Sequence, residues 1–446
     1  VYCFILFITE AFLIATPFYG EIIKNVYLYG KVKLVYAYLD SQVTGSCTRP
    51  FQLTVDKLKK GLQDAQSEGI KVKGLILLNP QNPLGDIYSL SEMQDFLEFA
   101  KRHELHVIVD EIYMLSVFDD SATFHSVLEM DRLPDPQRTH VLWGISKDFA
   151  MSGIRFGALY TLNQDVIKAV SCFNYFHGIC GPIQYQIAEL LRDRGMQKIC
   201  EVLEEQEREI LNEDKDPLCL SESEGTVDST DEVIFVSHHQ EPTSSGSSTL
   251  GDLIGLLQQQ MRSSDWLQKN TVEQFAQEKP EVYDVFSNLD WINQVYLRTN
   301  HERLKAAHTF VTDELKTLGV PFLNRNAGFF VWIDFRKYLR KRTLEEEMLL
   351  WKRFLDKKVL LSPGTSFECN EPGWFASLFA DKMNRLRLGM QKICEVLEEQ
   401  EREILNEDKD PLCLSESEGT VDSTDEVIFV SHHQNQLPLG VPLLVI

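Results

Sequence analysis

Short apolar segments alternate with amphipathic segments between residues 11 and 161. The apolar segments predict buried strands at 11–15, 33–39, 74–79, 105–110, 141–146 and 155–161. Between them, the spacing of the apolar residues predicts amphipathic helices at 55–69 and 91–103. Fully apolar strands that alternate with such helices are typical of an α/β fold with a mostly parallel sheet flanked by helices.

The same pattern returns after residue 290, where it predicts a smaller C-terminal α/β domain. Helices are expected at 302–318 and 344–358, and a strand at 326–335. The stretch between the two regions shows little of this pattern. We therefore divide the chain into four parts, which are a partial large domain at 1–194, an insertion at 195–289, the small domain at 290–388 and a tail at 389–446.

The insertion and the tail share an identical segment, because residues 195–240 recur as residues 389–434. Each copy carries 13 acidic against 3 basic residues, so the two copies account for almost all of the net charge of −23. The remainder is nearly neutral, which disfavours a basic surface for nucleic acid. The exact identity indicates a recent exon duplication or a gene-model error, and we expect the acidic segments to be disordered, with the tail disordered past Asn406.

The first 15 residues are apolar but do not resemble a membrane span. Glu10 interrupts the run, which is shorter than the roughly 20 residues that a spanning helix needs. With no initiating Met, the segment reads as a buried strand of an N-terminally truncated large domain. The nine cysteines form no CxxC pair, so neither a zinc site nor a disulfide framework is predicted, and the expected location is cytoplasmic.

Polar residues follow three of the predicted strands directly. These segments are Asn79–Gly85, Asp110–Tyr113 and Ser146–Lys147. Because ligands of parallel sheets bind at the carboxyl ends of the strands, the three segments form a candidate site. A carboxylate at the end of an apolar strand is costly unless it is paired, which makes Asp110 a candidate functional group or a helix N-cap.

Five motifs together resemble the class I and II aminotransferases, the pyridoxal 5'-phosphate (PLP) enzymes of fold type I. They are SKDFAMSGIR at 146–155, NPQNPLG at 79–85, DEIY at 110–113, TPFYG at 16–20 and NAGFFVW at 326–332. Within that family the motifs are most similar to the animal 1-aminocyclopropane-1-carboxylate (ACC) synthase-like branch. The resemblance covers about residues 11–194 and 290–390.

The resemblance implies roles for the residues of the candidate site. Lys147 would bond covalently to the cofactor aldehyde and act as the catalytic base. Asp110 would pair with the pyridine nitrogen, and Asn82 and Tyr113 would bind the ring oxygen.

The remaining cofactor contacts also come from the resemblance. Arg155 would bind the phosphate through its planar fork, with Ser146 as a further phosphate ligand. Tyr19 would stack on the cofactor ring. Each of these residues also has an ordinary alternative, which is a solvated or packed side chain.

Three departures from the family pattern concern the phosphate and the substrate. Gly144 stands where many members carry a phosphate-binding serine, and Ala376 stands where an arginine that clamps the substrate carboxylate is expected. The chain also begins too late to include a phosphate-binding loop that family members carry further upstream. The substrate-binding residues therefore stay unknown.

Three functions are consistent with these patterns. The first is a PLP-dependent enzyme that acts on amino acids at the α-carbon by transamination or elimination, and the resemblance implies that it is a homodimer. The second is a PLP-binding protein with impaired catalysis. The third is an acidic interaction module, which the neutral remainder and the dense cofactor motifs disfavour. No metal, nucleic acid or membrane partner is predicted.

Overall fold

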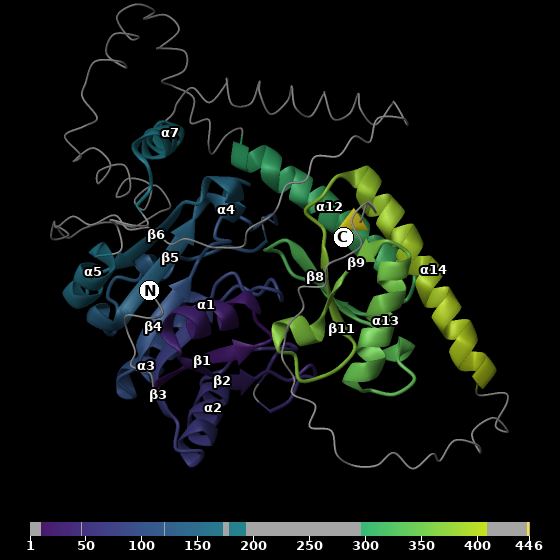
Figure 1. The fold of residues 1–446 in the computed structure, drawn as a ribbon, viewed down its shortest axis with the longest axis horizontal. Coiled ribbons are helices and arrows are strands. Elements are labelled where there is room, and N and C mark those ends of the chain that lie inside the picture. Colours follow the sequence, from purple (N-terminus) through teal and green to yellow (C-terminus); the bar gives the residue numbers. More distant parts are fainter. Residues whose placement is uncertain are drawn as a thin grey trace, which may run out of the picture. The chain divides into compact units, whose positions relative to one another are not determined.

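A computed structural model describes residues 10–45, 47–119, 121–172, 178–192, 296–407 and 444–445. The chain divides into two compact units (Figure 1). Unit 1 holds the residues up to Lys305 together with Asn326–Gly328, and unit 2 holds Ala306–Arg325 and the residues from Phe329 onward. The predicted insertion at 195–289 lies outside the described residues, as do residues 1–9 and the tail from residue 408 to residue 443.

Unit 1 is built on a six-stranded sheet with the order β2-β1-β3-β4-β5-β6. The strands are β1 (Glu10–Thr16), β2 (Lys33–Tyr38), β3 (Lys71–Leu78), β4 (His106–Asp110), β5 (Thr139–Gly144) and β6 (Gly157–Thr161). The first five are parallel, and β6 pairs antiparallel with β5 at the edge. The mostly parallel sheet that the apolar pattern predicts is therefore confirmed.

Helices cover both faces of this sheet. They are α1 (Glu21–Gly30), α2 (Val55–Ser67), α3 (Leu90–Arg102), the short α4 (Ile145–Asp148), α5 (Gln164–Ser171) and α7 (Gly181–Arg192). Helix α1 packs on the face that carries Phe12 and Ile14 of β1. Helix α2 packs on the opposite face, where a Cβ built at Gly61 would lie 2.9 Å from the Leu13 side chain. Alternate side chains of one fully buried strand thus contribute to two separate cores.

Two helix starts in unit 1 follow directly from the sequence. Thr54 caps α2 by accepting a hydrogen bond from the Lys57 backbone N–H. Ser89 and Glu92 form a reciprocal capping box at the start of α3. Within the described residues, none of the helices is both long enough and apolar enough to span a membrane.

Unit 2 contains an antiparallel sheet with the order β10-β11-β8-β7. Its strands are β7 (Phe322–Leu323), β8 (Phe330–Asp334), β10 (Ser362–Pro363) and β11 (Trp374–Leu378). A second, two-stranded pairing joins β9 (Val359–Leu360) to β12 (Leu444–Val445). The helices are α12 (Arg298–Thr317), whose residues from Ala306 onward belong to this unit, α13 (Leu344–Asp356) and α14 (Met383–Glu407).

Helix α14 crosses the residue at which the second copy of the repeat begins. Residue 389 lies inside this helix, and the helix continues to Glu407. Met390, Ile393 and Val396 are buried, although the sequence analysis placed them in the tail. Their spacing of three residues places them on one helix face. The first part of the second copy therefore contributes to the apolar core of unit 2.

Candidate functional site at the carboxyl edge of the unit 1 sheet

The three segments singled out in the sequence all follow parallel strands of unit 1. Asn79 comes directly after β3, Asp110 is the last residue of β4, and Lys147 lies in α4 immediately after β5. Because β3, β4 and β5 are parallel neighbours, these residues lie together at the carboxyl ends of the three strands, which we call the carboxyl edge of the sheet (Figure 1). The Asn79 backbone N–H donates to the Asp110 carbonyl oxygen at 2.9 Å, which joins two of the segments.

Asp110 carries a carboxyl group that the surrounding protein largely removes from water. Its side chain keeps some exposed surface, yet the surrounding protein removes enough water to raise its pKa to about 6. Two influences oppose this rise, namely a hydrogen bond of 3.1 Å from the Ile112 N–H and the positive charge of Lys147. Among the described residues, the Ile112 N–H is the donor that this carboxyl binds.

Tyr113 interacts electrostatically with Tyr19, Asp110 and Asp148. Burial raises the pKa of its phenol, and the negative charges of Asp110 and Asp148 and the phenol of Tyr19 act in the same direction. Tyr113 is therefore a neutral hydrogen-bond donor at any physiological pH. Tyr19 itself is 38% exposed, in the segment after β1.

Asn82 lies in the turn that follows β3. Its side chain is buried, and its oxygen Oδ1 has no hydrogen-bond partner among the described residues. A buried amide that lacks a partner costs stability, so this turn carries a polar group whose partner is not supplied by the described chain.

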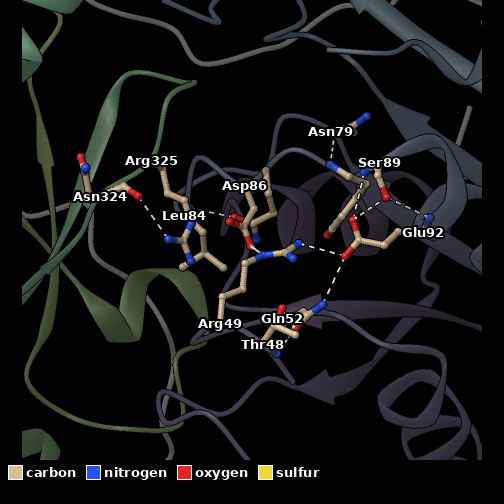
Figure 2. Close-up of polar contacts among 12 residues, drawn as sticks. Thr48, Arg49, Gln52, Asn79, Leu84, Asp86, Ser89, Glu92, Asn324 and Arg325 are labelled. Atoms are coloured by element: carbon tan, nitrogen blue, oxygen red, sulfur yellow. Dashed lines mark hydrogen bonds and ion pairs between the residues drawn. The ribbon is translucent and has the colours of Figure 1, made fainter. Parts of the chain in front are cut away.

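Residues with no predicted role at the site hold the Asn82 turn in place. The Gln81 amide donates to the Pro17 carbonyl oxygen and accepts from the Leu84 N–H, which ties the turn to the Tyr19 segment. Below the turn, Arg49 donates to Asp86 at 3.3 Å and to Glu92 at 3.1 Å (Figure 2). Apart from the Gln81–Leu84 contact, local periodicity carries no signal for these contacts, because the partners are 37 to 64 residues apart.

Ser146 directly precedes Lys147, and Arg155 follows it eight residues later along the chain. Ser146 is half-buried inside α4, and Arg155 follows the short 3-10 helix Ser152–Ile154 in a left-handed conformation. The Arg155 guanidinium donates to the Ser152 carbonyl oxygen at 2.9 Å. Strand β6 begins only at Gly157, because the backbone turns at Arg155, so the strand predicted from residue 155 is shorter than expected.

Gly144 meets a steric limit that the sequence did not reveal. It pairs with Gly157 across the β5–β6 ladder, and a Cβ at this position would lie 2.8 Å from the Phe156 carbonyl oxygen. A serine here would require the backbone to shift. The close approach of β5 and β6 therefore leaves no room for the serine that the resemblance predicts at this position.

Ala376 lies in β11 of unit 2 and is 1% exposed. It pairs with Trp332 of β8, and the alternation of the strand places Trp374 on the same face. The two indole rings are stacked, with an interplanar angle of 4° and centroids 6.1 Å apart. The position where an arginine is expected is thus part of a buried, apolar and aromatic cluster.

The described residues contain no group of three or more His, Cys, Asp or Glu side chains arranged to hold a metal ion. The chemistry that this edge offers is that of a primary amine, a desolvated carboxyl, a neutral phenol and an amide without a partner.

Relatives of known identity share most of this chain. Human 1-aminocyclopropane-1-carboxylate synthase-like protein 1 is 50% identical over 388 residues, which cover 87% of this chain and 58% of the human protein. A human protein named probable inactive 1-aminocyclopropane-1-carboxylate synthase-like protein 2 is 43% identical over 396 residues, covering 89% of this chain and 53% of that protein. The chain thus spans less than two thirds of the length of these relatives.

A solved structure shows the same fold. The PLP-bound C-S lyase from Staphylococcus hominis aligns with a TM-score of 0.52 and 16% identity, covering 88% of this chain and 72% of the lyase. The family model described as aminotransferase class I and II matches residues 1–219 and 281–385. The chain therefore belongs to the class I and II aminotransferase family, whose cofactor is pyridoxal phosphate and whose fold is fold type I.

Proposed function

We propose that this chain binds PLP covalently through Lys147 and acts on an amino acid at its α-carbon, by transamination or elimination. The observation that carries the proposal is the state of Asp110. Its carboxyl is desolvated, has one hydrogen bond and is influenced by the charge of Lys147. A protonated ring nitrogen placed against Asp110 would supply the charged donor that this carboxyl lacks.

The other polar groups of the edge fit the opposite side of such a ring. Asn82 has a buried amide with an oxygen that lacks a partner, and Tyr113 is a neutral donor. Both would donate to the ring oxygen, with the Asn82 amide turned to present its NH2 group, since amide oxygen and nitrogen positions are interchangeable by rotation. Tyr19, which is partly exposed, would cover one face of the ring.

The chain's own residues would then carry out binding and proton transfer. Bound PLP supplies a ring that accepts electrons and so stabilises negative charge at the substrate α-carbon. Asp110 would keep the proton on the ring nitrogen, and Arg155 and Ser146 would hold the phosphate. The Lys147 amine would act as the base that takes the proton from the substrate α-carbon and returns it to the product.

A second candidate function is that of a PLP-binding protein with impaired catalysis. Ala376 supports it, because a buried alanine that pairs with Trp332 offers no charge to a substrate carboxylate. A relative that is 43% identical is itself named probably inactive. In either case the proposal includes a homodimer, which sedimentation of the purified protein would test.

The experiment that tests PLP binding uses the purified chain mixed with PLP. We expect an absorbance band of the lysine-bound cofactor, and borohydride should fix the cofactor on the peptide that contains Lys147. The variant Lys147→Ala should lose this label completely, because no other described side chain holds the position of its amine. A label that persists in Lys147→Ala would refute the assignment.

Addition of amino acids to the same sample separates the two candidates. An enzyme should change the cofactor spectrum at millimolar amino acid and form a keto acid or an elimination product. The impaired protein should keep the spectrum of the lysine-bound cofactor. Product formation at a rate above that of Lys147→Ala would exclude the impaired alternative.

A further inference from the structure

The residue after Lys147 is a buried carboxylate with an unusual set of partners. Asp148 is the last residue of α4 and is 1% exposed. Its Oδ2 accepts a hydrogen bond of 2.7 Å from the Trp143 indole, and its Oδ1 accepts one of 3.1 Å from the Leu115 N–H. Among the described residues, no cation lies within ion-pair distance of this carboxyl.

These contacts connect α4 to three other segments of unit 1. Trp143 belongs to β5, and Leu115 lies two residues after Tyr113. The Tyr296 hydroxyl donates to the Asp148 backbone oxygen at 3.1 Å, and its ring stacks on Phe149. The turn that carries Lys147 is therefore fastened to the strand before it and to the segment of Tyr113.

Both oxygens of Asp148 face donors, and this explains why the residue is an acid. An asparagine has one acceptor and one donor group, so it would leave one N–H facing another N–H. Burial raises the pKa of the Asp148 carboxyl, while the two donors act in the opposite direction. The negative charge of Asp148 also helps to raise the pKa of Tyr113. Asp148 therefore acts electrostatically on a residue of the candidate site.

We infer that Asp148 is a positioning residue for Lys147. It holds the α4 turn against the segment after Tyr113 and so sets where the Lys147 amine lies relative to Asp110. This inference rests on the proposed function, because it assumes that Lys147 is the covalent anchor. It goes beyond that function by assigning the geometry of the anchor to a residue that touches neither cofactor nor substrate.

The test measures two quantities in the variant Asp148→Asn. One is the total PLP retained per chain after ultrafiltration, and the other is the fraction of retained PLP that borohydride fixes on Lys147. A displaced amine lowers the second quantity more than the first. We expect the fixed fraction to fall about tenfold, the loss typical for removal of one hydrogen bond to a charged group. General loss of folding would instead lower the retained PLP and leave the fixed fraction unchanged.

Glu111→Gln is the matched control. Glu111 is also a buried carboxyl next to a site residue, and it accepts from the Ser126 hydroxyl at 2.7 Å and the Val127 N–H at 2.8 Å. Its contacts do not reach α4, so the fixed fraction should equal that of the wild type. If Asp148→Asn does not fold, Trp143→Phe removes one donor to the same carboxyl and should give a smaller decrease in the fixed fraction.

The outcomes separate this inference from the proposed function. Wild-type protein that fixes no PLP on Lys147 overturns the proposed function and this inference with it. Wild-type protein that fixes PLP, together with an unchanged fixed fraction in Asp148→Asn or, where that variant does not fold, in Trp143→Phe, overturns the positioning role alone. A fixed fraction that falls equally in Glu111→Gln also overturns it.

Discussion

Glu347 of unit 2 and Asp110 of unit 1 are two desolvated acids with different sets of hydrogen-bond donors. In unit 2, Glu347 is fully buried and accepts hydrogen bonds from the backbone N–H groups of Thr365 and Gly373 at 3.1 Å and 2.6 Å. In unit 1, Asp110 is desolvated but accepts only the Ile112 N–H among the described donors. Asp110 also differs in this way from Glu111 and Asp148 of its own unit, each of which accepts two hydrogen bonds, and such an incomplete set of donors is typical of a functional site.

The same contrast applies to the sheets. The carboxyl edge of the unit 1 sheet carries the desolvated carboxyl of Asp110 and the buried amide oxygen of Asn82, which has no partner among the described residues, and both features cost stability. In the unit 2 sheet, Ala376 pairs with Trp332, whose ring stacks on Trp374, and all three side chains are buried. The predicted cofactor-binding positions are therefore polar, while the position predicted to bind the substrate carboxylate belongs to a buried apolar cluster.

The largest expected effect comes from Glu111→Gln and concerns stability against pH. Burial raises the pKa of Glu111 from 4.5 to about 8. The unfolded chain loses this proton above pH 4.5, whereas the folded chain holds it up to about pH 8. The free energy of unfolding of the wild type therefore falls as the pH rises from 4.5 to about 8. Glutamine cannot ionise. The free energy of unfolding of the variant should therefore gain on the wild type by up to about 1.4 kcal/mol per pH unit in this window.

Urea unfolding at pH 5, 6.5 and 8 measures this gain. Glu347→Gln is the comparison, because each of its two carboxylate oxygens accepts from a backbone N–H group, which cannot turn to accept from an amide. Glu111 instead faces the Ser126 hydroxyl, which can rotate. Glu347→Gln should therefore destabilise the protein by about 1–3 kcal/mol at pH 5, where Glu111→Gln has little effect. Equal behaviour of the two variants would contradict the distinction.

Asp110→Asn should separate ligand binding from stability. We expect the affinity for PLP to fall about 100-fold, because the ring nitrogen loses an anionic partner. The protein without PLP should not lose stability, because asparagine can still accept from the Ile112 N–H. Spectroscopic titration with PLP and thermal unfolding without it measure the two effects. Unchanged affinity, or a large loss of stability, would indicate that Asp110 serves the fold.

Ala376→Arg has the smallest expected effect and tests the unit 2 side of the comparison. We expect the affinity for amino acids, measured as the change in the cofactor spectrum, to rise about tenfold, since a charge-assisted pair contributes roughly that much. Ala376→Met is the control, because it adds comparable length without charge. The same affinity in both variants would mean that the missing charge at this position does not limit binding.

Much of the architecture follows from local patterns. Apolar runs of five to seven residues that alternate with amphipathic helices favour strands of a parallel sheet, although the edge strands β2 and β6 are only partly buried. The strand predicted at 141–146 is shifted by two residues, since β5 runs from Thr139 to Gly144 and α4 begins at Ile145. The second copy of the repeat was assigned to the tail, with disorder expected past Asn406, but its first residues form part of α14, because their apolar face is buried within unit 2.

By itself the sequence predicted the strands of the unit 1 sheet, the helices α2, α3, α12 and α13, and the polar residues that follow the strands, since these depend on neighbours a few positions away. It also carried the motif around Lys147. Only the tertiary structure decided that Gly144 has no room for a side chain, that Asp110 is short of partners and that Asp148 fastens the turn of Lys147. Those properties arise from contacts between distant segments, and a linear pattern of apolar and polar positions does not encode such contacts.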